Sequence, residues 1–80
     1  MRKYLAEFSI YDEYNLELEK DSETFTDFDE AYKYIQRYIR VWFEKREVEL
    51  YGDFVIKETD TENDSLYTEW RYDYNGQLLS

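Results

Sequence analysis

The sequence contains no cysteine, histidine or proline and only two glycines. Without cysteine and histidine, Ser-His-Asp and Cys-His catalytic arrangements are excluded, as are zinc sites of the usual ligand set. The isolated Gly52 and Gly76 cannot build a phosphate-binding loop or a dinucleotide-binding fingerprint. A disulfide framework, which small secreted domains generally need, is also impossible. An enzyme that uses two carboxylates as acid and base is the remaining alternative, but no pair stands out among the twenty acids and so small a domain has little room for a deep pocket. We therefore predict a non-enzymatic protein with no catalytic residues, no metal ligands and no cofactor.

Long apolar runs are missing as well. Arg2 and Lys3 stand near the N-terminus, but no apolar segment follows them as it would in a signal peptide. No stretch approaches the roughly 20 apolar residues of a membrane span. We therefore expect a cytoplasmic protein that does not contact a membrane.

Aromatic residues, in contrast, are abundant. Hydrophobic residues make up 42% of the chain and aromatic residues 21%, including ten tyrosines. An 80-residue chain buries only about 60% of its extended surface, so a core this rich in aromatic side chains favours folding over disorder. Residues 1–80 are predicted to form a single domain.

Alternation of apolar and polar residues predicts strands at about residues 4–11, 16–19, 48–57 and 66–74. In each strand the apolar set, which includes Leu16, Leu18 and Leu66, is expected to face the core. The polar stretch 21–26 shows no pattern and is expected to be a connection.

Glycine positions add two local predictions. Gly52 predicts a bulge or bend in the third strand. Asn75-Gly76 predicts a type I′ turn, after which residues 77–79 would fold back as a short fifth strand.

Between residues 28 and 42, apolar residues recur at spacings of three and four, which predicts a helix of roughly 18–20 residues. Asp27 and Glu30 form a capping-box pattern at its start. Lys45 and Arg46 would lie in its last turn, where the helix dipole favours cations. The apolar stripe consists of Phe28, Ala31, Ile35, Ile39 and Trp42.

Together these elements predict an α+β fold of the order ββαββ. We expect an antiparallel sheet of four strands, or five with residues 77–79, and one long helix packed on one face. The other face would be open to solvent. Exposed strand edges are compatible with a monomer or a homodimer.

Negative charge is the strongest compositional signal. Twenty acids and ten bases give a net charge of −10. Residues 27–46 hold four acids and five bases, so the other sixty residues carry −11. Such a chain repels nucleic acid and attracts basic surfaces, although acidity can also serve solubility alone.

The open sheet face is the predicted interaction surface. Residues on one face of a strand lie about 6.6–6.8 Å apart, so a row of carboxylates there could stand in for phosphates, with tyrosines adding packing. A solvated polar face is the ordinary alternative. The predicted partner-binding residues are Glu7, Glu17, Glu19, Glu49, Tyr51, Asp53, Asp60, Glu62, Asp64, Tyr67, Glu69 and Asp73.

Two other candidate sites are weaker. The acidic stretch from Asp60 to Asp64 resembles the start of a calcium loop, but Ser65 and Arg71 occupy the positions that require glycine and glutamate. Lys33, Arg37 and Arg40 form a basic stripe that could touch phosphate. We instead expect this stripe to be neutralised by Asp29 and Glu44 at i+4 spacing, so direct nucleic-acid binding is not predicted.

In its small size, lack of cysteine, acidity and tyrosine content, the chain resembles the small acidic inhibitors of bacteriophages and mobile elements, which include DNA mimics and anti-CRISPR proteins. The resemblance implies an inhibitor that occupies the basic nucleic-acid-binding surface of a host defence nuclease, such as a CRISPR effector, in a bacterial cytoplasm. The basic helix stripe departs from a uniformly acidic mimic. The alternative is an acidic interaction module, such as a toxin immunity protein or a small regulatory subunit.

Overall fold

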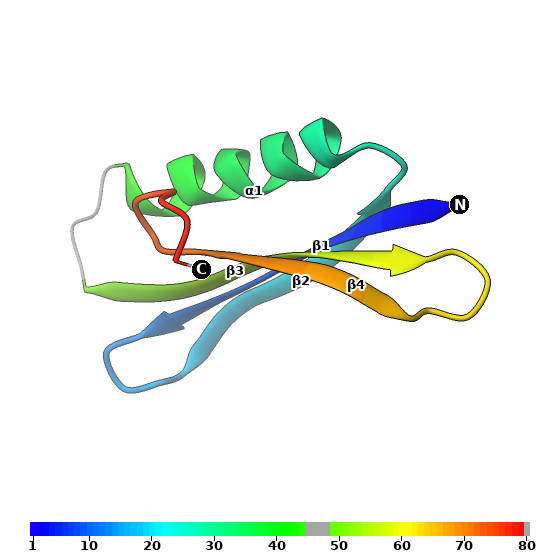
Figure 1. The fold of residues 1–80 in the computed structure, drawn as a ribbon. Helices are drawn as coiled ribbons and strands as arrows, with labels where there is room; N and C mark the ends of the chain where they lie inside the picture. The colour runs from blue at the N-terminus through cyan, green and yellow to red at the C-terminus, as the bar shows by residue number, and fades with distance from the viewer. Residues whose placement is uncertain (45–48, 80) are drawn as a thin grey trace.

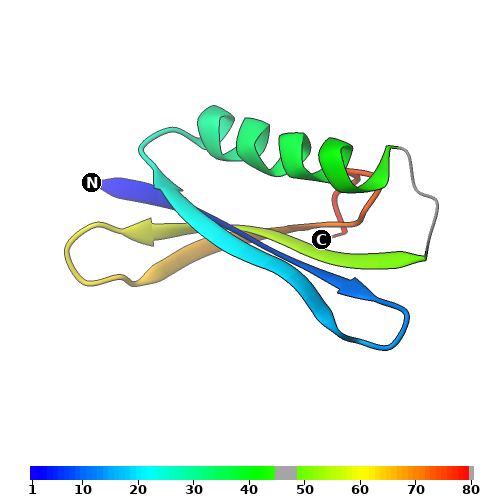
Figure 2. The same cartoon turned by 180° about the vertical axis from the view of Figure 1, so that it is seen from behind.

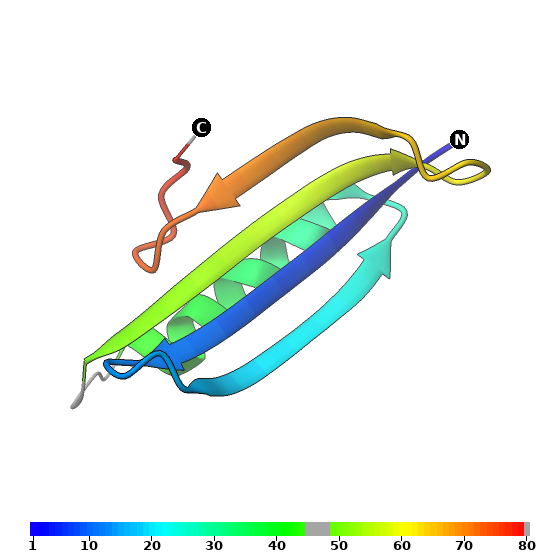
Figure 3. The ribbon, with the colours of Figure 1, turned by 90° about the horizontal axis from the view of Figure 1, so that it is seen from below.

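The computed structural model describes residues 1–44 and 49–79 and has the predicted α+β architecture, with one helix packed on a four-stranded antiparallel sheet (Figure 1). The strand order is β2-β1-β3-β4, so β1 and β3 are central and β2 and β4 form the edges (Figure 3). No helix in the described ranges is long and apolar enough to cross a membrane. The elements are β1 (Arg2–Asp12), β2 (Glu17–Phe25), α1 (Phe28–Phe43), β3 (Leu50–Asp60) and β4 (Leu66–Tyr72).

Helix α1 contains the predicted apolar stripe but is shorter than expected. Its N-cap is Asp27, whose Oδ1 accepts a hydrogen bond of 3.0 Å from the amide of Asp29. The helix ends at Phe43, and the amide of Glu44 donates to the carbonyl of Arg40. It therefore has 16 residues rather than 18–20. The predictions made for Lys45, Arg46 and Val48 fall outside the described residues.

The core lies between α1 and the two central strands. Phe8 stacks on Tyr38 of the helix at a ring-centroid distance of 4.3 Å and on Phe54 of β3 at 6.2 Å. Phe54 in turn meets the edge of the Phe43 ring. Aromatic pairs of this kind add to the stabilisation from apolar burial. The buried set is Ala6, Phe8, Ile10, Ala31, Ile35, Ile39, Phe54, Ile56 and Tyr72.

Three turns in the described part of the chain each begin with an aspartate that caps its own turn. Oδ1 of Asp12 accepts from the amides of Tyr14 and Leu16. Asp60 and Asp73 repeat this arrangement in the later turns, each accepting from two following amides. Aspartate suits this position because its short side chain satisfies turn amides that no strand partner reaches. Three of the twenty acids therefore have a local structural role.

The predicted type I′ turn at residues 75–76 is wrong. Type I′ needs positive φ at both central residues, whereas only Gly76, at +81°, has it, and Asn75 does not. The amide of Gly76 donates to the carbonyl of Asp73, and the amide of Asp73 donates to the carbonyl of Gln77. This is a three-residue loop closed by a left-handed glycine. Beyond it, the predicted fifth strand is reduced to an isolated bridge between Tyr72 and Leu78.

The bulge predicted at Gly52 is also absent. Gly52 pairs with Ile10 in an unbroken β1–β3 register. A Cβ atom at this position would lie 2.6 Å from Cε2 of Phe54 and 3.1 Å from Cζ of Phe43. Glycine is therefore needed here because two aromatic rings pack against the strand backbone.

Replacing Gly52 with alanine is expected to lower the free energy of unfolding by about 1–3 kcal/mol, the usual cost of overpacking a core. Urea denaturation would measure the change. Ser22→Ala on the exposed strand β2 is the control and is expected to shift stability by about 0.5 kcal/mol or less. A Gly52→Ala variant as stable as the parent chain would contradict this account of the glycine.

Strand β2 differs most from the prediction. It spans residues 17–25 and includes most of the polar stretch expected to be a connection. Leu16 precedes the strand and is 63% exposed, and Leu18 is 43% exposed, so neither packs in the core. In β4, a register shift places Leu66 opposite Thr59, and Leu66 is 56% exposed. The expected inward positions of all three leucines are therefore wrong.

Candidate protein-binding surface

The open face of the sheet is balanced in charge, which contradicts the prediction of an acidic face. Residues directly opposite each other in antiparallel strands point to the same side, so the strand registers define this face. It carries the predicted acids Glu7, Glu17, Asp53 and Glu69. Opposing them are four cations, Lys3, Lys20, Lys57 and Arg71.

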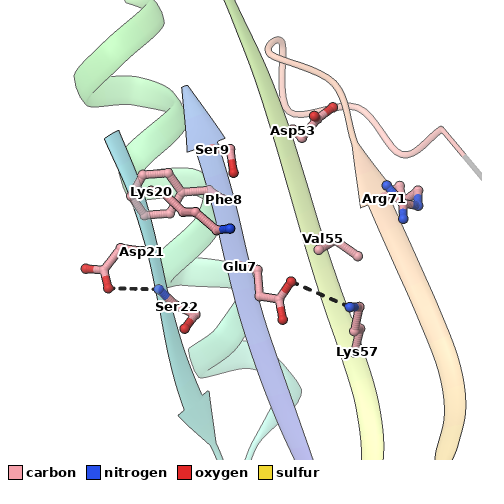
Figure 4. Close-up of a pocket in the computed structure, with 10 residues that line it drawn as sticks. All are labelled: Glu7, Phe8, Ser9, Lys20, Asp21, Ser22, Asp53, Val55, Lys57 and Arg71. Carbon is pink, nitrogen blue, oxygen red and sulfur yellow. Dashed lines mark hydrogen bonds and ion pairs between the residues drawn. The ribbon is translucent and has the colours of Figure 1, made fainter. Parts of the chain in front are cut away.

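A concavity of about 490 Å³ lies on this face and is lined by charges of both signs (Figure 4). Glu7 forms an ion pair of 3.5 Å with Lys57 across β1 and β3. At the β4 edge of the face, Arg71 pairs with Glu69 at 3.3 Å. Because these carboxylates already face cations within the fold, the open face is poorly suited to mimic a phosphate backbone.

Glu19 points to the other side of the sheet. A bulge between Ile10 and Tyr11 places Glu19 opposite Ile10 and Glu17 opposite Tyr11, so strict alternation along β2 is broken. The carboxylate of Glu19 accepts a hydrogen bond of 2.6 Å from the indole nitrogen of Trp42 on α1. Its predicted position on the open face is therefore wrong. The extra residue of β2 at the bulge breaks the alternation, so that Glu17 and Glu19 face opposite sides of the sheet.

The loop between β3 and β4 uses two of its three predicted acids internally. Oδ1 of Asp60 accepts from loop amides, while Oδ2 accepts from the hydroxyl of Tyr67 at 2.9 Å, and these bonds lower the pKa of Asp60. Asp64 forms an ion pair of 2.6 Å with Lys3. Glu62 stays exposed at the tip.

The remaining predicted residues are separated from one another. Glu49 lies just before β3, and Tyr51 is the second residue of that strand. The hydroxyl of Tyr51 donates a hydrogen bond of 2.7 Å to the carboxylate of Glu49. Asp73 lies beyond the end of β4, where its carboxylate caps the final turn. The twelve predicted residues thus form several small groups, most of them with internal partners, rather than one acidic face.

Negative charge is instead concentrated along one border of the molecule, which we call the acidic edge and define as residues 12–30. This segment forms the β1–β2 turn, the edge strand β2 and the start of α1 (Figure 2). Lys20 is its only base, so it carries −8 of the net −10. Its acids are Asp12, Glu13, Glu17, Glu19, Asp21, Glu23, Asp27, Asp29 and Glu30.

The acids of this edge are mostly exposed and unneutralised. All four ion pairs found in the described residues lie elsewhere. At one end, Glu23 and Glu30 line a groove together with Lys33 and Arg37 of the helix but form no ion pair with them. Of these acids, sequence reasoning selected only Glu17 and Glu19 as partner-binding residues. A running count of charge along the chain would have identified the rest.

Exposed apolar side chains accompany the charge. Tyr14, at the β1–β2 turn, is 82% exposed, and Leu16 and Leu18 follow it along the same edge. Tyrosine is enriched among the residues that dominate protein–protein interfaces, and the two leucines add apolar area beside it. The acidic edge thus combines uncompensated charge with apolar contact area.

The basic stripe on α1 is a separate surface. Lys33, Arg37 and Arg40 line an open hollow on the outer side of the helix. The ion pairs expected with Asp29 and Glu44 are not formed among the described residues. The molecule therefore presents a basic helix and an acidic strand on neighbouring surfaces.

Comparison of the chain with protein-family models, with curated proteins and with solved structures gave no match. The function is therefore inferred from the distribution of charge and apolar side chains on the surface.

Proposed function

We propose that this protein is a non-enzymatic inhibitor that binds the basic, nucleic-acid-binding surface of a bacterial defence nuclease, such as a CRISPR effector. The contact is made by the acidic edge and not by the open sheet face. The observation that carries the proposal is the −8 charge of residues 12–30, whose acids take part in none of the ion pairs of the described residues.

The geometry of β2 suits a surface that normally receives a nucleic-acid backbone. Its carboxylates lie on one extended strand, where successive residues on the same side are about 6.6–6.8 Å apart. They form a linear series rather than a compact cluster. Such a series attracts a basic groove at long range, which accelerates association and excludes the competing polyanion.

Apolar contacts give the complex its lifetime. Charge on exposed side chains contributes mainly to association rate and is screened by salt. Tyr14, Leu16 and Leu18 are the exposed apolar residues next to the acids, and their burial would slow dissociation. The proposal therefore predicts binding that weakens with salt but does not depend on charge alone.

Affinity capture with the immobilised protein tests the proposal. Bacterial lysate is applied at low salt, and bound proteins are released by stepped salt or by added DNA or RNA. We expect capture of a nucleic-acid-binding protein that competing nucleic acid displaces. A partner that nucleic acid does not displace would contradict mimicry and support an interaction module of another kind.

Two charge-matched triple variants locate the surface. Glu13→Gln, Glu17→Gln and Glu23→Gln remove three charges from the acidic edge at residues whose side chains form no hydrogen bond or ion pair in the described structure. We expect this variant to bind the captured protein at least about tenfold more weakly, because a few charge-assisted contacts are each worth about 1 kcal/mol or more. Loss of binding only in the matched variant Glu7→Gln, Asp53→Asn and Glu69→Gln would place the interface on the open face instead.

A further inference from the structure

The two edges of the sheet are not equivalent. The outer edge of β4 is partly occupied by the end of the chain, since the amide of Leu79 donates to the carbonyl of Arg71 at 2.7 Å and Leu78 bridges to Tyr72. Strand β2 pairs with β1 on one side only (Figure 3). Among the described residues, no segment covers its other side. Alternate backbone amides and carbonyls of β2 therefore point outward without a strand partner.

Strand β2 lacks several of the devices that usually block such an edge, although its charged side chains, three of them on the helix side, are one such device. It has nine residues, contains no proline or glycine, and its one bulge lies at the end next to the β1–β2 turn. Its only lysine, Lys20, is surrounded by acids. An open strand of this length is a template for pairing with an extended segment of another chain.

The charge of β2 determines which segment can pair. Glu19, Asp21 and Glu23 line its helix side, while Glu17 and Lys20 lie on the open side. A second copy that pairs with β2 and keeps its helix on the same side of the sheet would place acids opposite acids, and like charges on paired strands are destabilising. A basic segment would form cross-strand ion pairs instead.

The two ends of β2 differ in the charge around them. Near Phe25, the groove between β2 and α1 is lined by Glu23 and Glu30 but also by Lys33 and Arg37, which offset them. Among the described residues, Glu17, Glu19 and Asp21 at the other end of the strand form no ion pair with any cation. Basic side chains of an incoming segment are therefore expected at the β1–β2 turn end of the strand.

We propose that β2 binds a basic, extended segment of the partner as an additional strand of the sheet, with lysine or arginine side chains facing Glu17, Glu19 and Asp21. This inference rests on the proposed function and specifies how the acidic edge makes its contact. Backbone hydrogen bonds along β2 fix the register of the segment, and the carboxylates select for its charge.

A synthetic peptide of alternating lysine and valine, equal in length to β2, is the probe. The control peptide has the same sequence with N-methyl groups on its backbone amides, so that it keeps the charge but cannot pair as a strand. Affinity is measured at low salt by Trp42 fluorescence, since the indole of Trp42 is hydrogen-bonded to Glu19 of β2. Hydrogen exchange of the β2 amides reports strand formation directly.

We expect the unmodified peptide to bind at least about tenfold more tightly than the methylated one, since each lost backbone hydrogen bond costs about 1 kcal/mol. It should also protect outward amides of β2, and the Glu13, Glu17 and Glu23 triple variant should weaken it. Equal binding of the two peptides, or failure of both to bind, would overturn strand addition. Either result leaves the proposed function to be decided by the capture experiment. Protection of β2 amides in concentrated protein without peptide would show pairing with a second copy and would also overturn the proposal.

Discussion

Replacing Phe8 with alanine is expected to lower the free energy of unfolding by about 3–5 kcal/mol, the largest effect of any single substitution considered. Phe8 is 2% exposed and contacts the rings of Tyr34, Tyr38 and Phe54. Removing it leaves a cavity between the helix and both central strands. Because domains have only about 0.05–0.15 kcal/mol of stability per residue, this loss takes away much of the total.

Urea denaturation followed by circular dichroism measures the effect. Phe8→Leu keeps most of the volume and is expected to cost clearly less, while Tyr14→Ala, at a highly exposed position, should change stability by about 0.5 kcal/mol or less. If Phe8→Ala were no more destabilising than Phe8→Leu, the position of Phe8 at the centre of the aromatic core would be wrong.

Alkaline pH is expected to unfold the protein cooperatively. Burial raises the pKa of Tyr34 and of Tyr72, and hydrogen bonds to carboxylates raise those of Tyr51 and Tyr67. Burial and a hydrogen bond to Glu58 also raise the pKa of Tyr4. A folded-state pKa above the unfolded value of about 10 means that stability is fully present below pH 10 and is lost as pH rises through the folded pKa.

Tyrosinate absorbance and circular dichroism, recorded together above pH 9, test this expectation. Ionisation of these tyrosines should coincide with loss of the fold. Tyr34→Phe should move the transition to higher pH, because the hydroxyl of Tyr34 is buried without a hydrogen-bond partner in the described structure. Tyr14→Phe serves as the control and should leave the transition unchanged. Ionisation of all the tyrosines near pH 10 with the fold intact would contradict the proposed environments.

Helix α1 and strand β1 could be predicted because one side of each is buried. In α1 the buried Ala31, Ile35 and Ile39 repeat at helical spacing, so the pattern and the structure share one cause. In β1 the same holds for Ala6, Phe8 and Ile10, which alternate with half-buried residues. Secondary structure can be predicted from the sequence where burial against the core imposes a helical or an alternating spacing on the apolar residues.

Strand β2 could not be predicted in this way because it buries very little. Only Glu19 and Phe25 in this strand are even partly buried, so its side chains carry no apolar alternation. Pairing with β1 through the backbone makes it a strand, and backbone pairing is nearly independent of sequence. Its bulge then reverses the phase, which no count of alternating residues reveals.

The sequence by itself determined that the chain folds as an α+β domain with a large excess of negative charge, since composition and the periods of buried residues are properties of the chain alone. Only the tertiary structure decided where that charge is displayed. Strand register places Lys3, Lys20, Lys57 and Arg71 beside the acids of the open face and leaves β2 as the uncovered acidic border. The reason is physical: which side a residue faces depends on pairing and bulges between strands distant in sequence, which local patterns do not encode.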